Sequence, residues 1–297
     1  LFVVDNNSHD ASLAIIEELI PNATIIRQKE NLGFSKAHNQ IIRWTKSDYI
    51  LVVNPDISMD DTCIDLLVTA LEKYPEVGQA GGKLLWWNID EDSKTNILDS
   101  CGLEITRSYR IRDRFQGRED EGSEAGYVFG NSGALVMLRR TALDETRIPI
   151  QNKPSVFEYF DENFFAYKED CDLAWRMINA GWKAYFEPKA VAYHRRAVSG
   201  SRASHIERKN RVSINRYSYR NHLLMVYKNQ WWSLTLRHIF SIMAFEIAKF
   251  VYLISVDRSS ISGLRQALAL APLFAKKRRI VRRQRKIQPK ELGQWLH

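Results

Sequence analysis

Alternating apolar and polar segments in the first 75 residues predict strands that alternate with helices. Short aliphatic or β-branched runs, each followed by a polar turn, are typical of buried strands. Between these runs, apolar residues recur at helical spacing, as at Leu13, Ile16 and Leu19. The expected strands are Leu1–Val4, Thr24–Arg27 and Tyr49–Val53, and the expected helices cover residues 9–20, 34–45 and 60–74. This order predicts an α/β fold, with a Rossmann-like, mostly parallel sheet flanked by helices.

The pattern changes twice further along the chain. Strand-like runs follow at residues 83–87, 98–105, 127–138, 182–186 and 190–194, and one helix is expected over 169–180. Beyond Ser199 the sequence becomes rich in Arg, Tyr and Trp and favours long helices. We therefore divide the chain into an α/β domain over residues 1–199 and a helical C-terminal region over residues 200–297.

Charge separates the two parts more sharply than composition does. The 297 residues are 45% hydrophobic and 26% charged, which excludes a disordered or collagen-like protein. The net charge is +8, but residues 1–199 carry 23 Lys and Arg against 31 Asp and Glu, whereas residues 200–297 carry 20 against 4. Such a basic block usually binds a polyanion, either nucleic acid or an anionic membrane surface. Three widely spaced cysteines indicate reduced thiols and a cytosolic compartment.

The chain starts inside a strand-like run. Leu1 begins the run with no polar segment before it, and the basic segment of a signal peptide is not seen there. We therefore expect at least one further strand to precede position 1.

Residues 234–256 match a membrane span in length but not in composition. Arg237, His238, Glu246 and Lys249 interrupt the run, which leaves no uncharged stretch near the roughly 18 residues that a span needs. These four residues fall on one half of a helical wheel and the apolar residues on the other. Two tryptophans precede this amphipathic helix, and eight of the eleven residues in 276–286 are basic. The pattern favours a helix in an anionic membrane interface; the alternative is a helix packed on the protein's own core with a solvated basic tail.

Several polar residues follow the predicted strands directly. Asp5, Asn31 and Asp56 each come just after a strand, and ligands of parallel sheets bind at the carboxyl ends of the strands. A carboxylate at that position can hold a hard divalent cation, although Asp56 in Asn-Pro-Asp is also typical of an ordinary turn. His194 ends another strand. A single histidine there is more often structural, and it becomes a candidate metal ligand only if Asp56 lies beside it.

The run Glu169-Asp170-Cys171-Asp172 opens the helix expected over 169–180. A helical wheel places Asp170 at the edge of the apolar face, where a partly desolvated carboxylate can act as a general base. Arg176 could steady a phosphate. The simpler alternative is that acids favour a helix N-terminus and that Asp172 pairs with Arg176 four residues later.

Two further segments leave alternatives open. Small residues at 130–134 interrupt a strand, as expected for a bulge or for a place where a ligand approaches the backbone. Phe160, Asp161 and Glu162, with Phe164 and Phe165 after them, place aromatic rings beside acids, which suits either sugar stacking or core packing.

Taken together, these motifs resemble the inverting glycosyltransferases of family 2, which have the GT-A fold. The similar groups are the bacterial rhamnosyltransferase-like and galactofuranosyltransferase-like enzymes of cell-surface polysaccharide synthesis. The resemblance covers about residues 1–200. It is carried by residues 3–8, 31–39, 54–56 and 160–162 and by the Glu169 to Arg176 stretch, in this order.

The resemblance implies roles for individual residues. Donor binding would involve Asp5, Asn7, Asn31, Gly33, Asn39 and Asp56, and acceptor binding Gly130, Asn131 and Glu169. A divalent cation, Mg²⁺ or Mn²⁺, would be held by Asp56 and His194. Asp170 would be the general base and Arg176 would support the acidic site. The sequence departs from the family in lacking its first strand with the loop that follows, and in offering one firm carboxylate, Asp56, where the family motif has two.

The expected function is transfer of a sugar such as rhamnose from a nucleotide-diphosphate-sugar to a lipid-linked or polysaccharide acceptor. The expected place is the cytoplasmic face of the plasma membrane, with the C-terminal region on the lipid surface. The alternative is a non-catalytic relative that only binds nucleotide-sugar or glycan. Nucleic-acid binding through residues 202–220 and 276–286 rests on charge alone, so no nucleic-acid partner is expected.

Overall fold

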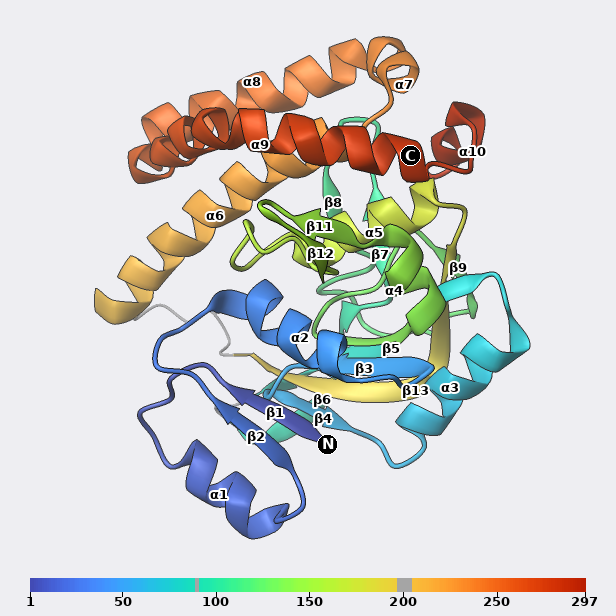
Figure 1. Ribbon diagram of the computed structural model, residues 1–297, viewed down its shortest axis with the longest axis vertical. Coiled ribbons are helices and arrows are strands. Elements are labelled where there is room, and N and C mark those ends of the chain that lie inside the picture. The colour runs from blue at the N-terminus through green and yellow to red at the C-terminus, as the bar shows by residue number, and fades with distance from the viewer. Residues whose placement is uncertain (89–90, 197–204) are drawn as a thin grey trace.

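The computed structural model describes residues 1–88, 91–196 and 205–297. Ser199, where the sequence divides the chain, and Arg202 lie outside the described residues. Figure 1 shows a central sheet with helices on both sides and a layer of long C-terminal helices at the top. The architecture is α/β, as expected.

The central sheet has seven strands. Three strands of its main path, β3, β5 and β13, run in one direction, and β10 and β4 run the opposite way. The path is β3 (Tyr49–Val53), β10 (Leu135–Arg139), β5 (Val77–Asn88), β13 (Lys183–Arg196) and β4 (Ile57–Met59), with β6 (Ser93–Ser100) on β5 and β9 (Gly126–Val128) on β13. Since β3, β5 and β13 share a direction, their carboxyl ends meet at one edge of the sheet.

Smaller elements surround the sheet. The parallel strands β1 (Phe2–Asp5) and β2 (Thr24–Arg27) form a pair of their own, and the short strands β7 (Leu103–Ile105) with β8 (Ile111–Asp113) and β11 (Ile148–Ile150) with β12 (Lys153–Glu158) form two further pairs. The helices are α1 (Ser12–Leu19), α2 (Gly33–Trp44), α3 (Cys63–Lys73), α4 (Arg140–Thr146) and α5 (Glu169–Asn179). All three strands and all three helices expected before residue 75 are present, and the strands at 24–27 and 49–53 have the expected bounds.

Several strand-like runs have bounds other than those expected. The run 98–105 is divided between β6 and β7, and the run 127–138 is divided between β9 and β10 at the small residues 130–134, which were expected to interrupt it. Gly130 packs against Ala174 of α5 there; a Cβ at Gly130 would lie 2.4 Å from the Ala174 Cβ. Conversely, the runs 182–186 and 190–194 belong to one strand, β13, which continues through a register shift between Glu187 and Val191.

The C-terminal helices share a core with the α/β domain. These helices are α6 (His205–Asn229), α7 (Trp232–Arg237), α8 (Ile239–Ser255), α9 (Ser262–Gln284) and α10 (Pro289–Gly293), with a 3₁₀ turn at Arg258–Ile261. Met225 and Phe274 are fully buried in one apolar cluster with Trp175 and Ala174 of α5. A part of the expected basic tail is therefore interior: Lys277 is only 6% exposed.

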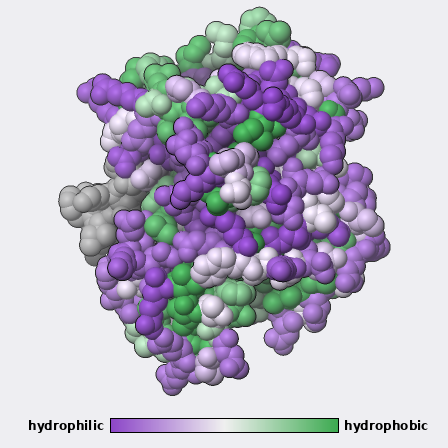
Figure 2. Space-filling model, viewed as in Figure 1, coloured by the Kyte–Doolittle hydropathy of each residue, from purple (hydrophilic) through white to green (hydrophobic). Residues whose placement is uncertain are grey.

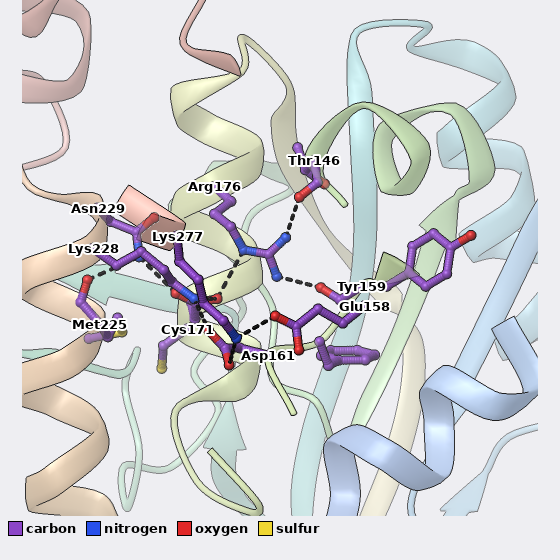
Figure 3. A network of polar contacts seen from close by, with 12 residues as sticks. Thr146, Glu158, Tyr159, Asp161, Cys171, Arg176, Met225, Lys228, Asn229 and Lys277 are labelled. Atoms are coloured by element: carbon purple, nitrogen blue, oxygen red, sulfur yellow. Dashed lines mark hydrogen bonds and ion pairs between the residues drawn. The ribbon is translucent and has the colours of Figure 1, made fainter. Parts of the chain in front are cut away.

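A buried network of charges joins the two parts (Figure 3). The Lys228 ammonium of α6 lies 2.5 Å from Asp161 Oδ2 and 2.9 Å from Asp172 Oδ2. The Lys277 ammonium of α9 lies 2.5 Å from Asp161 Oδ1 and also pairs with Glu158. Arg176 completes the network through its Nε, 2.9 Å from Asp172 Oδ2. The basic C-terminal region thus neutralises acids of the α/β domain inside the molecule.

The carboxyl groups of this network differ in their pKa. Burial alone would raise the pKa of Asp161, but the charges of Lys228 and Lys277 outweigh it and lower the pKa well below its usual range. Burial and the neighbouring Asp161 raise the pKa of Glu158 to about 7, against the opposing effect of Lys277. The Asp161 carboxylate is therefore the centre of negative charge between the two lysines.

Candidate active site

Two of the polar residues expected at strand ends meet at one edge of the central sheet: Asp56 follows β3, and His194 lies near the end of β13, where it contacts Asp56. Asp5 ends β1, which pairs with β2 in a separate sheet. The antiparallel strand β10 begins at the same edge, and the backbone N–H of Asn54 donates to the carbonyl of Ala134 at 2.9 Å. This edge is the candidate active site.

The loop after β1 and the loop before α2 are tied together by side-chain amides. Asp5 Oδ1 accepts a hydrogen bond from the Ser8 N–H at 2.9 Å, which shapes the loop after β1. The Asn6 side chain accepts from Leu32 N–H at 3.2 Å, and Asn31 accepts from Gly33 N–H at 2.8 Å. The loops that contain the expected donor residues therefore lie side by side.

Gly33 and Asn7 have backbone conformations that fit this loop contact. Gly33 has φ of +76°, and a Cβ there would lie 2.5 Å from the carbonyl oxygen of Phe165. Only glycine permits both the left-handed backbone and the close approach. Asn7 also has a positive φ of 69°, a conformation that asparagine tolerates better than most residues.

Asn39 and Arg176 are buried in the interior of the protein. The Asn39 amide is fully buried, accepts from Tyr159 and Phe160 N–H, and donates to the Phe160 carbonyl and to Glu162. Arg176 is 2% exposed and donates to the Thr146 and Tyr159 carbonyls as well as to Asp172. The structure thus shows both residues holding the segment around residue 160, and the pairing of Asp172 with Arg176 is confirmed.

Asp170 is half-buried at the start of α5. Its Oδ2 accepts from Gly133 N–H at 3.0 Å and its Oδ1 from Cys171 N–H at 2.6 Å. Gly133 precedes Ala134, whose carbonyl binds the loop of Asp56. The 130–134 segment therefore links the Asp170 carboxylate to the Asp56 loop.

Gly130 and Asn131 are occupied by contacts with the protein itself. Asn131 is 3% exposed; its backbone N–H donates to Gln79 Oε1 at 3.0 Å and its side chain donates to the Tyr185 carbonyl at 3.2 Å. Gly130 packs against α5, as described above. The small residues of this strand interruption are accounted for by close packing at these two positions.

Glu169 is a buried carboxyl group next to Asp170. Burial, together with the negative charge of Asp170, raises the pKa of Glu169 to about 8. Its Oε2 has no hydrogen-bond partner among the described residues. A pKa of about 8 keeps Glu169 mostly protonated at neutral pH, so its carboxyl group can donate a hydrogen bond next to Asp170.

Glu169→Gln is expected to stabilise the protein at high pH. A pKa raised in the folded state gives stability that is fully present below pH 4.5 and is lost as the pH rises through about 8. Glutamine stays neutral, so the variant should gain about 4–5 kcal/mol in the free energy of unfolding at pH 8.5 and almost nothing near pH 4.5. Urea denaturation at both pH values measures this. The same substitution at the exposed Glu18 should change neither value, and a pH-independent effect of Glu169→Gln would contradict the prediction.

His194 does lie beside Asp56, and a third residue joins them. His194 Nε2 is 3.2 Å from Asp56 Oδ2, and Nδ1 is 2.7 Å from Asp99 Oδ2. Burial alone would lower the pKa of His194, but the hydrogen bonds to Asp56 and Asp99 outweigh it and raise the pKa to about 9. Asp99 is itself held by the Trp86 indole N–H at 2.9 Å. Sequence reasoning missed Asp99, since nothing in the 98–105 run marks which side chains face the neighbouring strand.

These residues fit a divalent cation. Both ring nitrogens of His194 face carboxylates, and with a pKa of about 9 the ring carries both N–H protons at neutral pH. Loss of the Nε2 proton would free that nitrogen for a cation beside Asp56, while Nδ1–H donating to Asp99 would orient the ring, as in many metal sites. The set provides one imidazole nitrogen and one carboxylate, and no group of three or more candidate ligands is gathered within the described ranges. Further ligands would have to come from a bound substrate, as the phosphate oxygens of a nucleotide diphosphate can provide.

Comparison with known proteins gives consistent matches. The model of the family "Glycosyl transferase family 2" matches residues 1–147. The chain is 25% identical over 240 residues to the N-acetylglucosaminyl-diphospho-decaprenol L-rhamnosyltransferase of Mycobacterium tuberculosis, which covers 69% of this chain and 70% of that protein. It is 27% identical over 167 residues to an N-acetylglucosaminyltransferase of Azorhizobium caulinodans, covering 55% of this chain and 37% of that protein.

Solved structures show the same fold at low sequence identity. The crystal structure of GalNAc-T7 with UDP, GalNAc and Mn²⁺ aligns with a TM-score of 0.55 at 13% identity, over 78% of this chain and 41% of that one. The crystal structure of S. aureus TarS aligns with a TM-score of 0.50 at 13% identity, over 95% of this chain and 49% of that one. Both similarities concern the GT-A fold. The chain therefore belongs to glycosyltransferase family 2, with residues 1–147 as the matched part of its catalytic domain, and the protein is a glycosyltransferase.

Proposed function

We propose that the protein is a metal-dependent, inverting glycosyltransferase that moves a rhamnose-like sugar from a nucleotide-diphosphate-sugar to a lipid-linked acceptor. One observation carries this proposal: the 130–134 segment joins the Asp170 carboxylate to the loop of Asp56, and Asp56 contacts His194. A base for the acceptor and a set of ligands for the leaving diphosphate thus belong to one edge of the sheet.

Inversion by direct displacement requires one base on the acceptor side. Asp170 is the half-buried carboxylate in that place, and two backbone N–H groups fix its orientation. It would accept the proton of the attacking hydroxyl while the sugar leaves the diphosphate. The protonated Glu169 beside it would keep a second negative charge away from Asp170.

The donor side would hold the diphosphate through a cation. Asp56 and His194 would bind that cation, Mg²⁺ or Mn²⁺, which supplies positive charge for the departing diphosphate when bound. Asp5 and the joined loops that contain Asn7 and Asn31 would contact the nucleoside. The relative from Mycobacterium tuberculosis is named for L-rhamnose transfer to N-acetylglucosaminyl-diphospho-decaprenol, which supports a rhamnose-like donor and a lipid-linked acceptor here.

A lipid-linked acceptor calls for contact with a membrane. No helix within the described residues is long and apolar enough to span a bilayer. Helix α8 instead exposes an apolar face: Phe240 is 86% exposed, Met243 51% and Ile247 57%. Figure 2 shows apolar surface at the upper edge of the molecule, where α8 lies in Figure 1. We therefore propose that α8 lies in the interface of the plasma membrane on its cytoplasmic face.

Asp56→Ala is expected to weaken donor binding at least about 10-fold in the presence of Mn²⁺, because removing a metal ligand or its orienting partner costs 10- to 100-fold in affinity. Calorimetric titration with a panel of nucleotide-diphosphate-sugars measures the effect, with and without a chelator. Asp99→Asn should give a smaller loss of the same kind, since it leaves both ligands in place. Asp61→Ala, at an exposed position, is the control. Donor binding that is unaffected by both chelator and Asp56→Ala would remove the cation from this site.

A further inference from the structure

A hollow lies among the C-terminal helices, away from the candidate active site. It has a volume of about 590 Å³ and is lined by Trp231, Trp232, Arg282, Arg285 and Lys286, among others. The Lys286 N–H donates to the carbonyl of Asn179, the last residue of α5, at 2.9 Å. Asp170 lies at the opposite end of α5, which is 11 residues long and therefore roughly 16 Å in length. The hollow is thus separate from the catalytic edge.

The lining of the hollow is strongly cationic. Within the part of the chain that the structure describes, no carboxylate forms an ion pair with Arg282 or Arg285, whereas Lys286 pairs with the exposed Glu145 at 2.7 Å. Arg285 donates to the carbonyls of Asn229 and Gln230, so its position is fixed by the backbone. Burial and the charges of nearby arginines lower the pKa of Arg285 to about 10. An anion in the hollow would relieve this repulsion.

Aromatic rings complete the site. The Arg285 guanidinium lies 4.0 Å from the centre of the Trp231 ring, which holds it flat against one wall. Trp232 borders the hollow and is 60% exposed. Tryptophan side chains are enriched at the level of the lipid headgroups in membrane proteins. Arginine guanidinium groups match phosphate oxygens with two parallel hydrogen bonds.

The hollow is joined through Trp232 to the start of α7, and exposed apolar residues follow along α7 and α8. Trp232 begins α7, and the exposed apolar residues continue from it through Leu236 of α7 to Phe240 and Met243 of α8. Leu236 is 69% exposed. A cationic hollow at one end of an exposed apolar face matches a ligand that has an anionic head and an apolar chain.

We propose that the hollow of Arg282, Arg285 and Lys286 binds the phosphate headgroup of an anionic phospholipid while the apolar face of α7 and α8 contacts its acyl chains. This site rests on the proposed membrane contact and is distinct from the acceptor site at Asp170. Lipid binding in the hollow would place the N-terminal end of α8 next to the headgroups. The enzyme would thereby be oriented on the membrane, with catalysis at the other end of α5.

The test compares two neighbouring arginines of α9 in the full chain. Arg282 lines the hollow, and Arg283 is equally exposed but does not line it. Arg282→Gln is expected to reduce binding to phosphatidylcholine vesicles that contain 30% phosphatidylglycerol about 10-fold, and Arg283→Gln less than about 3-fold. Co-sedimentation measures both, and Arg285→Gln should repeat the larger loss. Equal losses for Arg282→Gln and Arg283→Gln would overturn the site, since they indicate diffuse charge attraction.

Binding measurements with other vesicles and with inorganic phosphate identify the ligand. Pure phosphatidylcholine vesicles should bind weakly; binding as tight as to the anionic vesicles would overturn the headgroup assignment. Inorganic phosphate, titrated by calorimetry without vesicles, should bind at least about 10-fold more weakly than the lipid, and comparable affinity would assign the hollow to a free anion instead. Donor binding by Arg282→Gln should equal that of the unmodified protein. Loss of donor binding in this variant, with vesicle binding unchanged, would count against the proposed function. Unchanged vesicle binding by the variant would count against the lipid site.

Discussion

Asp161→Asn is expected to lower the free energy of unfolding by about 3–5 kcal/mol, because it leaves two buried ammonium groups without their shared counter-charge. Asp161 is fully buried, and each of its carboxylate oxygens lies 2.5 Å from a lysine, Lys228 on one side and Lys277 on the other. Asparagine keeps the shape of the side chain but removes the charge. The two lysines belong to α6 and α9, so the substitution should loosen both helices from the α/β domain together.

Urea denaturation followed by far-UV circular dichroism measures this loss. Lys277→Met is expected to cost less than Asp161→Asn, because Lys228 remains paired with Asp161 and Glu158, whose pKa is already near 7, can take up a proton. Glu104→Gln provides the matched control: Glu104 pairs with Arg112 at the surface, and such pairs contribute about 0–1 kcal/mol. A loss for Asp161→Asn as small as for Glu104→Gln would show that the network does not hold the helices in place.

This network explains why the C-terminal region was only partly predictable from the sequence. An excess of 16 positive charges over residues 200–297 indicates a polyanionic partner, and counting cannot reveal that Lys228 and Lys277 have carboxylate partners within the same chain. The helical wheel of α5 was limited for the same reason. It correctly pairs Asp172 with Arg176, but it cannot show that Lys228 of α6 lies over that face and that both residues are buried.

The α/β part was more predictable, because short strands and amphipathic helices each follow from a local pattern. The meeting of Asp56 and His194 at one edge also follows from strand direction, because β3 and β13 run the same way. The contact of Asp99 with His194 does not, since it depends on how β6 pairs with β5 and on which faces their side chains occupy. The roles of Phe160 and Phe164 were left open between sugar stacking and core packing; both rings are buried in the core.

Asp170→Asn is expected to reduce kcat by about 10³-fold, because general-base catalysis contributes typically 10²- to 10⁴-fold. The asparagine oxygen can still accept the hydrogen bond from Gly133 N–H, so the 130–134 segment and the Asp56 loop should keep their places. Donor binding should therefore survive with little change. This combination separates loss of the base from loss of the site.

The measurement pairs transfer kinetics with calorimetric donor titration in the presence of Mn²⁺. Glu169→Gln is the neighbouring comparison: glutamine resembles the protonated acid at neutral pH, so its kcat should fall far less than that of Asp170→Asn. Full activity of Asp170→Asn would exclude Asp170 as the base. Loss of donor binding together with activity would instead make Asp170 a residue that positions the Asp56 loop through Gly133, because that hydrogen bond is the link between the two halves of the site.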